Sequence, residues 1–90
     1  MNTALEKVKE LLQNEKAAEA QQLFNGIPVV DSIDYLLIKG VLEQKFQHWG
    51  KAYNSFTKVL EKDPLNVDAK TRLEMIKGIL NFFNPDQLNP

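Results

Sequence analysis

The chain has 90 residues and a net charge of −1, with 43% hydrophobic residues, 26% charged residues and no cysteine. This size and composition are typical of a soluble globular protein with one domain and one hydrophobic core. Lysine and glutamate are mixed along every segment, which excludes the basic surface that nucleic-acid binding requires, and the lack of cysteine excludes disulfides and thiolate chemistry.

The first two expected elements are helices over residues 3–13 and about 16–25, joined by a tight turn. In both, apolar residues recur at intervals of three and four, as in an amphipathic helix. The apolar residues are Leu5, Val8, Leu11 and Leu12 in the first helix, and Ala17, Ala20, Leu23, Phe24 and Ile27 in or just after the second. Two residues are expected to stop the second helix. Gly26 adopts the left-handed conformation that is common at helix ends, and Pro28 cannot continue the helix.

Two further helices are expected over about residues 33–46 and 49–61. Asp31 or Ser32 can cap the first of them, and Pro64 closes the second. The first is apolar over much of its circumference, which predicts that it lies between other helices. The apolar residues are Tyr35, Leu37, Ile38, Val41, Leu42 and Phe46 in the first, and Trp49, Ala52, Tyr53, Phe56, Val59 and Leu60 in the second.

A fifth helix is expected over residues 67–83, capped by Asn66 and stopped before Pro85. Its main apolar face consists of Ala69, Leu73, Ile76, Leu80 and Phe83, which Met75, Ile79 and Phe82 extend sideways. Residues 84–90 form a tail that we expect to be frayed or loosely packed through Leu88. No segment alternates with the period of a strand, so the predicted fold class is all-α with five helices.

The second and fourth helices repeat each other. The pairs of residues that recur with an offset of 32 (52 − 20) are Ala20 and Ala52, Phe24 and Phe56, and Ile27 and Val59. The helices that precede them have the same offset. Residues 3–32 and 33–64 are therefore predicted to be two copies of one helix–turn–helix unit.

The second copy carries a distinctive set of residues: Gly40, Trp49, Ala52, Phe56, Val59 and Pro64. With this set it resembles the tetratricopeptide repeat (TPR) family, whose unit has about 34 residues. Small residues at Gly40 and Ala52 let two antiparallel helices come close together. The first copy departs from the pattern, because Val8 stands in the place of Gly40 and Ser32 in the place of the closing proline.

The resemblance implies a right-handed array of helix–turn–helix units, a TPR-like superhelix, within a single domain over residues 1–90. Its parts are a degenerate first repeat (3–32), a second repeat (33–64), a C-terminal capping helix (67–83) and the tail (84–90). The alternative is an unrelated orthogonal bundle of five helices.

No residue pattern in the chain points to catalysis. His48 is the only histidine and there is no cysteine, so a typical zinc site is not expected. Ser32 and Ser55 lack the surroundings of a nucleophile, and the four glycines are too scattered to form a phosphate-binding loop. We predict no enzyme activity, no cofactor and no metal.

The remaining function is binding. The resemblance implies that a peptide lies in the concave groove lined by the first helix of each unit, and helical phase adds Leu5 and Thr71 to that face. The predicted peptide-binding residues are Lys9, Leu12, Leu37, Val41, Gln44, Lys45, Arg72 and Met75. Some TPR proteins clamp a peptide carboxylate, but Leu5, Ile38 and Asp68 stand at the comparable places, so we do not expect a clamp here.

Two hypotheses follow for the protein as a whole. The first is a non-catalytic adaptor or scaffold module with a protein or peptide partner, and with neither nucleic acid nor membrane as a ligand. The alternative is a self-associating structural module, a weak homodimer, whose groove or final helix is covered by another copy. The longest aliphatic or aromatic run, residues 35–38, is far below the ~20 residues of a membrane span, and the N-terminus lacks a signal-peptide core, so we expect a cytoplasmic protein.

Overall fold

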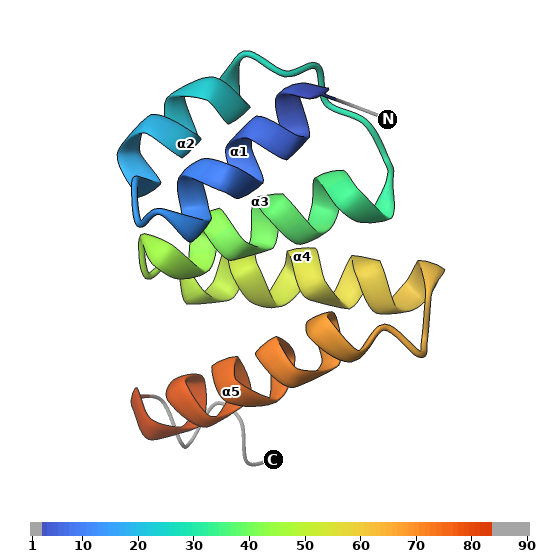
Figure 1. Cartoon of the computed structure of the whole chain (residues 1–90). Helices are drawn as coiled ribbons and strands as arrows, with labels where there is room; N and C mark the ends of the chain where they lie inside the picture. Colours follow the sequence, from blue (N-terminus) through green and yellow to red (C-terminus); the bar gives the residue numbers. More distant parts are fainter. Residues whose placement is uncertain (1–2, 84–90) are drawn as a thin grey trace.

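The computed structural model describes residues 3–83, which form five α-helices (Figure 1). These helices are α1 (Thr3–Gln13), α2 (Ala17–Asn25), α3 (Ile33–Lys45), α4 (Trp49–Lys62) and α5 (Val67–Phe83). The described residues contain no strand, so the predicted all-α class and the five helices are confirmed, with bounds within one residue of those expected. The tail, with its expected packing through Leu88, lies outside the described residues.

In the view of Figure 1 the helices follow one another from top to bottom as α2, α1, α3, α4 and α5, so that α3 lies in the middle. The first hairpin, α1 and α2, packs on one side of α3, while α4 packs on another side and carries α5. This position explains why α3 is apolar around so much of its circumference, as the sequence predicted.

Two clusters of buried side chains form the core, and α3 contributes to both. The first cluster consists of Leu5, Val8, Ala20, Phe24, Ile27, Tyr35, Ile38 and Leu42. The second consists of Leu36, Ala52, Phe56, Val59, Ala69, Leu73 and Ile76. Each cluster holds together one hairpin and one neighbour, because no helix here can bury its apolar face alone.

Two of the helices begin at side-chain caps that the sequence indicated. The hydroxyl of Ser32 accepts a hydrogen bond from the Tyr35 N–H at 3.1 Å, which selects Ser32 rather than Asp31 as the cap of α3. The side-chain oxygen of Asn66 accepts one from the Ala69 N–H at 2.9 Å at the start of α5. Each cap satisfies a backbone donor that has no partner within the helix.

The turn between α1 and α2 has the same geometry as the turn between α3 and α4. Glu15 and Gln47, which occupy the same place in the two hairpins, have positive φ angles of 60° and 62°. The next residues, Lys16 and His48, donate their N–H groups over 2.8 Å to the carbonyls of Leu11 and Glu43. A left-handed residue followed by this hydrogen bond is the Schellman motif. The turns of the two hairpins therefore share one backbone geometry, at the offset of 32 (47 − 15) that the sequence shows.

The expectation for Gly26 was wrong. Gly26 has φ −84° and ψ −7°, in the right-handed region. Its N–H donates to the carbonyl of Leu23 at 3.1 Å, and the Ile27 N–H donates to that of Phe24 at 3.0 Å. These short-range hydrogen bonds tighten the last turn of α2 without a left-handed residue, and Pro28 then prevents the helix from continuing.

Replacing Gln47 with glycine is expected to raise the free energy of unfolding by about 0.5–1 kcal/mol, because glycine adopts a positive φ without steric cost. The same change at Gln22, which is exposed in the middle of α2, is expected to lower it by a similar amount, since glycine is a poor helix former. Urea unfolding monitored by circular dichroism measures both variants. A loss of stability in Gln47→Gly would contradict the expected relief.

Candidate functional site

One helix from each hairpin and the final helix form a groove, which we call the α1–α3–α5 groove. Its volume is about 250 Å³. The residues that line it are Lys9, Leu12 and Gln13 from α1, Asp34, Leu37, Ile38 and Val41 from α3, and Asp68 and Arg72 from α5.

The floor of the α1–α3–α5 groove is apolar. Ile38 is only 3% exposed and belongs to the first core cluster. Leu12 packs against that cluster, while Leu37 and Val41 pack against the second, and all three are half-buried. The floor is therefore the outer surface of the core itself, which holds these side chains in place and leaves part of each available to a ligand.

Charged side chains of both signs stand at the rim of the groove. Lys9 Nζ lies 4.0 Å from Asp34 Oδ1, and both side chains of this ion pair are exposed. Arg72 Nε donates to Asp68 Oδ1 at 2.7 Å. Exposed ion pairs of this kind contribute only about 0–1 kcal/mol, so a ligand that offers its own charged groups can replace them at small cost.

Arg72 also connects α5 to α3. Its second donor, NH1, donates to the side-chain oxygen of Gln44 at 3.0 Å. The amide nitrogen of Gln44 lies 4.0 Å from the sulfur of Met75, a residue of α5 that is 49% exposed. Gln44 and Met75 thus extend the groove at one end without being among its lining residues.

The structure brings together most of the residues predicted from the sequence. Five of them line the groove: Lys9, Leu12, Leu37, Val41 and Arg72. Lys45 is exposed at the last residue of α3, one turn beyond Val41, and does not line it. Leu5, which helical phase placed on this face, is 5% exposed in the first core cluster, and Thr71 is exposed outside the groove.

Four lining residues were missed as binding residues, namely Gln13, Asp34, Ile38 and Asp68. A signal for the two acids was present, since Asp34 precedes Leu37 by three positions and Asp68 precedes Arg72 by four, which places each pair on one helix face.

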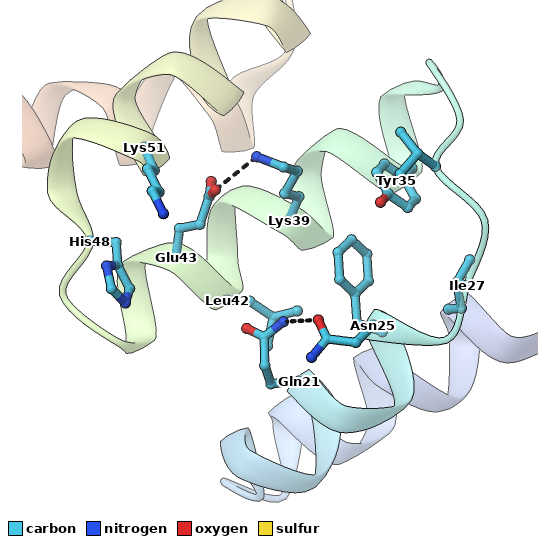
Figure 2. A pocket seen from close by; sticks show the side chains of 11 residues that line it. Gln21, Asn25, Ile27, Tyr35, Lys39, Leu42, Glu43, His48 and Lys51 are labelled. Atoms are coloured by element: carbon cyan, nitrogen blue, oxygen red, sulfur yellow. Dashed lines mark hydrogen bonds and ion pairs between the residues drawn. The ribbon is translucent and has the colours of Figure 1, made fainter.

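A second hollow, which we call the α2–α3–α4 cleft, opens on a different side of α3 (Figure 2). Its volume is about 380 Å³. The residues that line it are Gln21, Phe24, Asn25, Ile27, Val29, Tyr35, Lys39, Leu42, Glu43, His48 and Lys51. The sequence did not indicate this cleft, because its residues come from three helices and a loop that only the tertiary structure brings together.

Its inner wall is built from core side chains. The ring centroids of Phe24 and Tyr35 lie 4.7 Å apart and the ring planes meet at 30°, so Tyr35 packs between α2 and α3. Leu42 is 1% exposed beside them. His48 is an exposed turn residue at the start of α4.

A polar network joins α3 to α4 at the edge of this cleft. Ser55, only 2% exposed, donates its hydroxyl to Glu43 Oε1 at 2.6 Å. Lys39 Nζ donates to Glu43 Oε2 at 2.7 Å and to the hydroxyl of Ser55 at 3.3 Å. The network satisfies a buried hydroxyl and occupies both oxygens of the carboxylate, so it serves the packing of α3 on α4.

Within residues 3–83, no three histidine, cysteine, aspartate or glutamate side chains come close enough to hold a metal ion. None of the described helices combines the length and the apolar character needed to cross a membrane.

No protein-family model, curated protein or solved structure matches this chain. Its function is therefore inferred from its own residues and their arrangement.

Proposed function

We propose that the chain is a non-catalytic, cytoplasmic interaction module of the TPR-like kind, an adaptor or scaffold that holds a peptide or short helix of a partner protein in the α1–α3–α5 groove. The observation that carries this proposal is the groove itself, which has an apolar floor supported by the core and a rim of weakly held ion pairs. Binding surfaces commonly combine an apolar centre with a polar rim in this way.

The TPR-like arrangement is supported by the spacing of the helix caps and turns. The caps of α3 and α5, Ser32 and Asn66, recur with an offset of 34 (66 − 32), which equals the unit length of that family. The two Schellman turns recur with an offset of 32 (47 − 15). Gly40 also lies directly against the ring of Phe56, as two closely packed helices of one unit require.

The groove favours a partner segment with two properties. An apolar stripe, such as the i, i+3, i+4 positions of a helix, would cover Leu37 and Val41. Charged residues of both signs beside that stripe would form ion pairs with the groove, the acids with Lys9 and Arg72 and the bases with the carboxylates that these two now contact. A ligand with a single charge sign would leave one rim carboxylate or one rim cation without compensation.

Backbone NMR spectra recorded against a library of amphipathic peptides test the proposal. We expect shifts at Leu37, Val41 and Arg72 for the peptides that bind. Val41→Lys is expected to weaken that binding by about ten-fold or more, because it places a charge on the apolar floor. Val67→Lys is the matched control, since Val67 is 75% exposed and lies outside the groove. Absence of shifts at the groove, or equal binding by both variants, would contradict the proposal.

A second candidate is self-association through α5. The described part of the chain packs against α5 mainly through α4, and four large apolar residues on or just before α5 are exposed: Leu65 (83%), Val67 (75%), Met75 (49%) and Phe82 (80%). A second copy could cover them. Sedimentation velocity up to high protein concentration distinguishes the two candidates, because a monomer at every concentration would exclude self-association.

A further inference from the structure

The α2–α3–α4 cleft is separate from the proposed peptide groove, since the two share no lining residue. Its volume of about 380 Å³ lies within the range of about 300–1,000 Å³ that is usual for small-ligand sites. Three features of its lining indicate what it can bind.

The first feature is the hydroxyl of Tyr35. Tyr35 is 4% exposed, and no described residue makes a hydrogen bond with its hydroxyl. No fully enclosed side-chain oxygen or nitrogen among the described residues lacks a partner, so this hydroxyl must reach open space. Figure 2 shows it turned toward the interior of the cleft. A buried tyrosine normally pairs its hydroxyl, and in this position the hydroxyl can donate to an acceptor on a ligand in the cleft.

The second feature is the start of α4. Among the helices that the structure describes, α4 is the one whose first turn carries no acid, whereas Glu6, Glu19, Asp34 and Asp68 occupy the first turns of the others. Lys51 stands at the position that Glu19 occupies in the first hairpin, with the same offset of 32 (51 − 19) as the rest of the repeat.

Two side chains at the start of α4, those of His48 and Lys51, are also available to a ligand. His48 makes no side-chain cap, and Lys51 has no ion pair with a described residue. A cation at a helix N-terminus opposes the helix dipole, and together they attract an anion.

The third feature is the state of Glu43, the one acid in the lining. Both of its oxygens are occupied, one by Ser55 and the other by Lys39, whose charge offsets its own. The cleft therefore keeps the positive charge of Lys51 uncompensated, beside a wall formed by Phe24 and Leu42.

We propose that the α2–α3–α4 cleft binds a ligand with a carboxylate on a short apolar body. The carboxylate lies at the start of α4, against His48 and Lys51. The apolar body lies against Phe24 and Leu42, and the hydroxyl of Tyr35 donates to an acceptor at the far end of the ligand. A free small carboxylic acid and the acidic side chain of a peptide both supply this chemistry.

NMR titration of the full chain tests this with two pairs of probes. The first pair is 3-(4-methoxyphenyl)propionate and its uncharged amide, and the second is acetyl-Glu-Phe-amide and acetyl-Gln-Phe-amide. We expect the acids to shift the backbone signals of Tyr35, Gly50 and Lys51, and to bind about ten-fold more tightly than their amides. The tighter of the two acids identifies the source, a free acid or a peptide side chain.

Two variants separate binding from folding. Lys51→Glu is expected to weaken the binding of both acids by about ten-fold or more. It is also expected to raise the melting temperature, because an acidic side chain in the first turn interacts favourably with the helix dipole. Tyr35→Phe removes only the hydroxyl. We expect it to retain the fold and to weaken the binding of 3-(4-methoxyphenyl)propionate by about five-fold. Lys70→Glu is the control, with the same change of charge near the start of α5, outside the cleft.

Several results would overturn the assignment. They are equal affinity for acids and amides, unchanged binding by Lys51→Glu, shifts confined to the α1–α3–α5 groove, or no binding of either acid. A loss of binding that is just as large in Lys70→Glu would also overturn it, since the effect would then follow net charge rather than position. Binding of peptides in the groove is unaffected by any of these outcomes.

Discussion

Replacing Gly40 with alanine is expected to lower the free energy of unfolding by about 2 kcal/mol, as overpacking of a well-filled core does. A Cβ atom at this position would lie 2.7 Å from both Cε1 and Cζ of Phe56, far inside van der Waals contact. Phe56 is fully buried in the second core cluster, so its ring cannot retreat without disturbing its neighbours. At so short a distance the cost lies in the upper part of the usual range of about 1–3 kcal/mol for overpacking, and the gain of about 1 kcal/mol that alanine brings to a helix offsets only part of it.

The sign of this effect can be checked against a second glycine. Gly78 lies in the interior of α5, and a Cβ atom there would have nothing within 4 Å. Gly78→Ala is therefore expected to raise the free energy of unfolding by about 0.5–1 kcal/mol through helix propensity alone. Urea unfolding of the two variants measures both. A stabilised Gly40→Ala protein would show that the two helices do not depend on close approach at this point.

Truncating Phe56 to alanine is expected to have the largest effect of any single change discussed, a loss of about 3–5 kcal/mol. Among the residues that the structure describes, Phe56 is the largest fully buried side chain, and its removal leaves a cavity in the cluster that contains Leu36, Ala52 and Ile76. A domain of this size has a total stability on the order of 5–15 kcal/mol, so much of it would be lost.

The equivalent residue of the first hairpin provides the comparison. Phe24 is 6% exposed and lines the α2–α3–α4 cleft, so water can enter the space that Phe24→Ala leaves. We therefore expect a smaller loss for Phe24→Ala than for Phe56→Ala. Denaturant titration quantifies both, and hydrogen exchange shows whether protection falls first in α3 and α4. Equal losses would mean that the two hairpins contribute alike to stability.

Local sequence signals determined the helices. Ser32 and Asn66 cap their helices because a short polar side chain can reach the free N–H groups of the first turn, which involves only a few neighbouring residues. The apolar period predicted all five helices, and the recurrence of Ala20 and Phe24 at Ala52 and Phe56 predicted the second hairpin as a copy of the first. Helical phase also predicted that Leu37 and Val41 share one face.

The tertiary structure decided which residues on a given face are covered. Leu5 and Leu12 share a face of α1, yet Leu5 is buried while Leu12 reaches the groove, because burial depends on where neighbouring helices cross. Lys45 shares the phase of Val41 but lies past the groove. Gly26 is in the right-handed conformation because of the hydrogen bonds at the end of α2, although glycine at a helix end often adopts the left-handed one.

The α2–α3–α4 cleft was beyond the reach of the sequence for the same reason. Tyr35 and Lys51 lie on different helices, α3 and α4, and each has an ordinary local role, in packing or in solvent. Only the packing of α2, α3 and the start of α4 places them around one space. Periodicity specifies the direction in which a side chain leaves its helix, whereas the packing of helices specifies what it meets there.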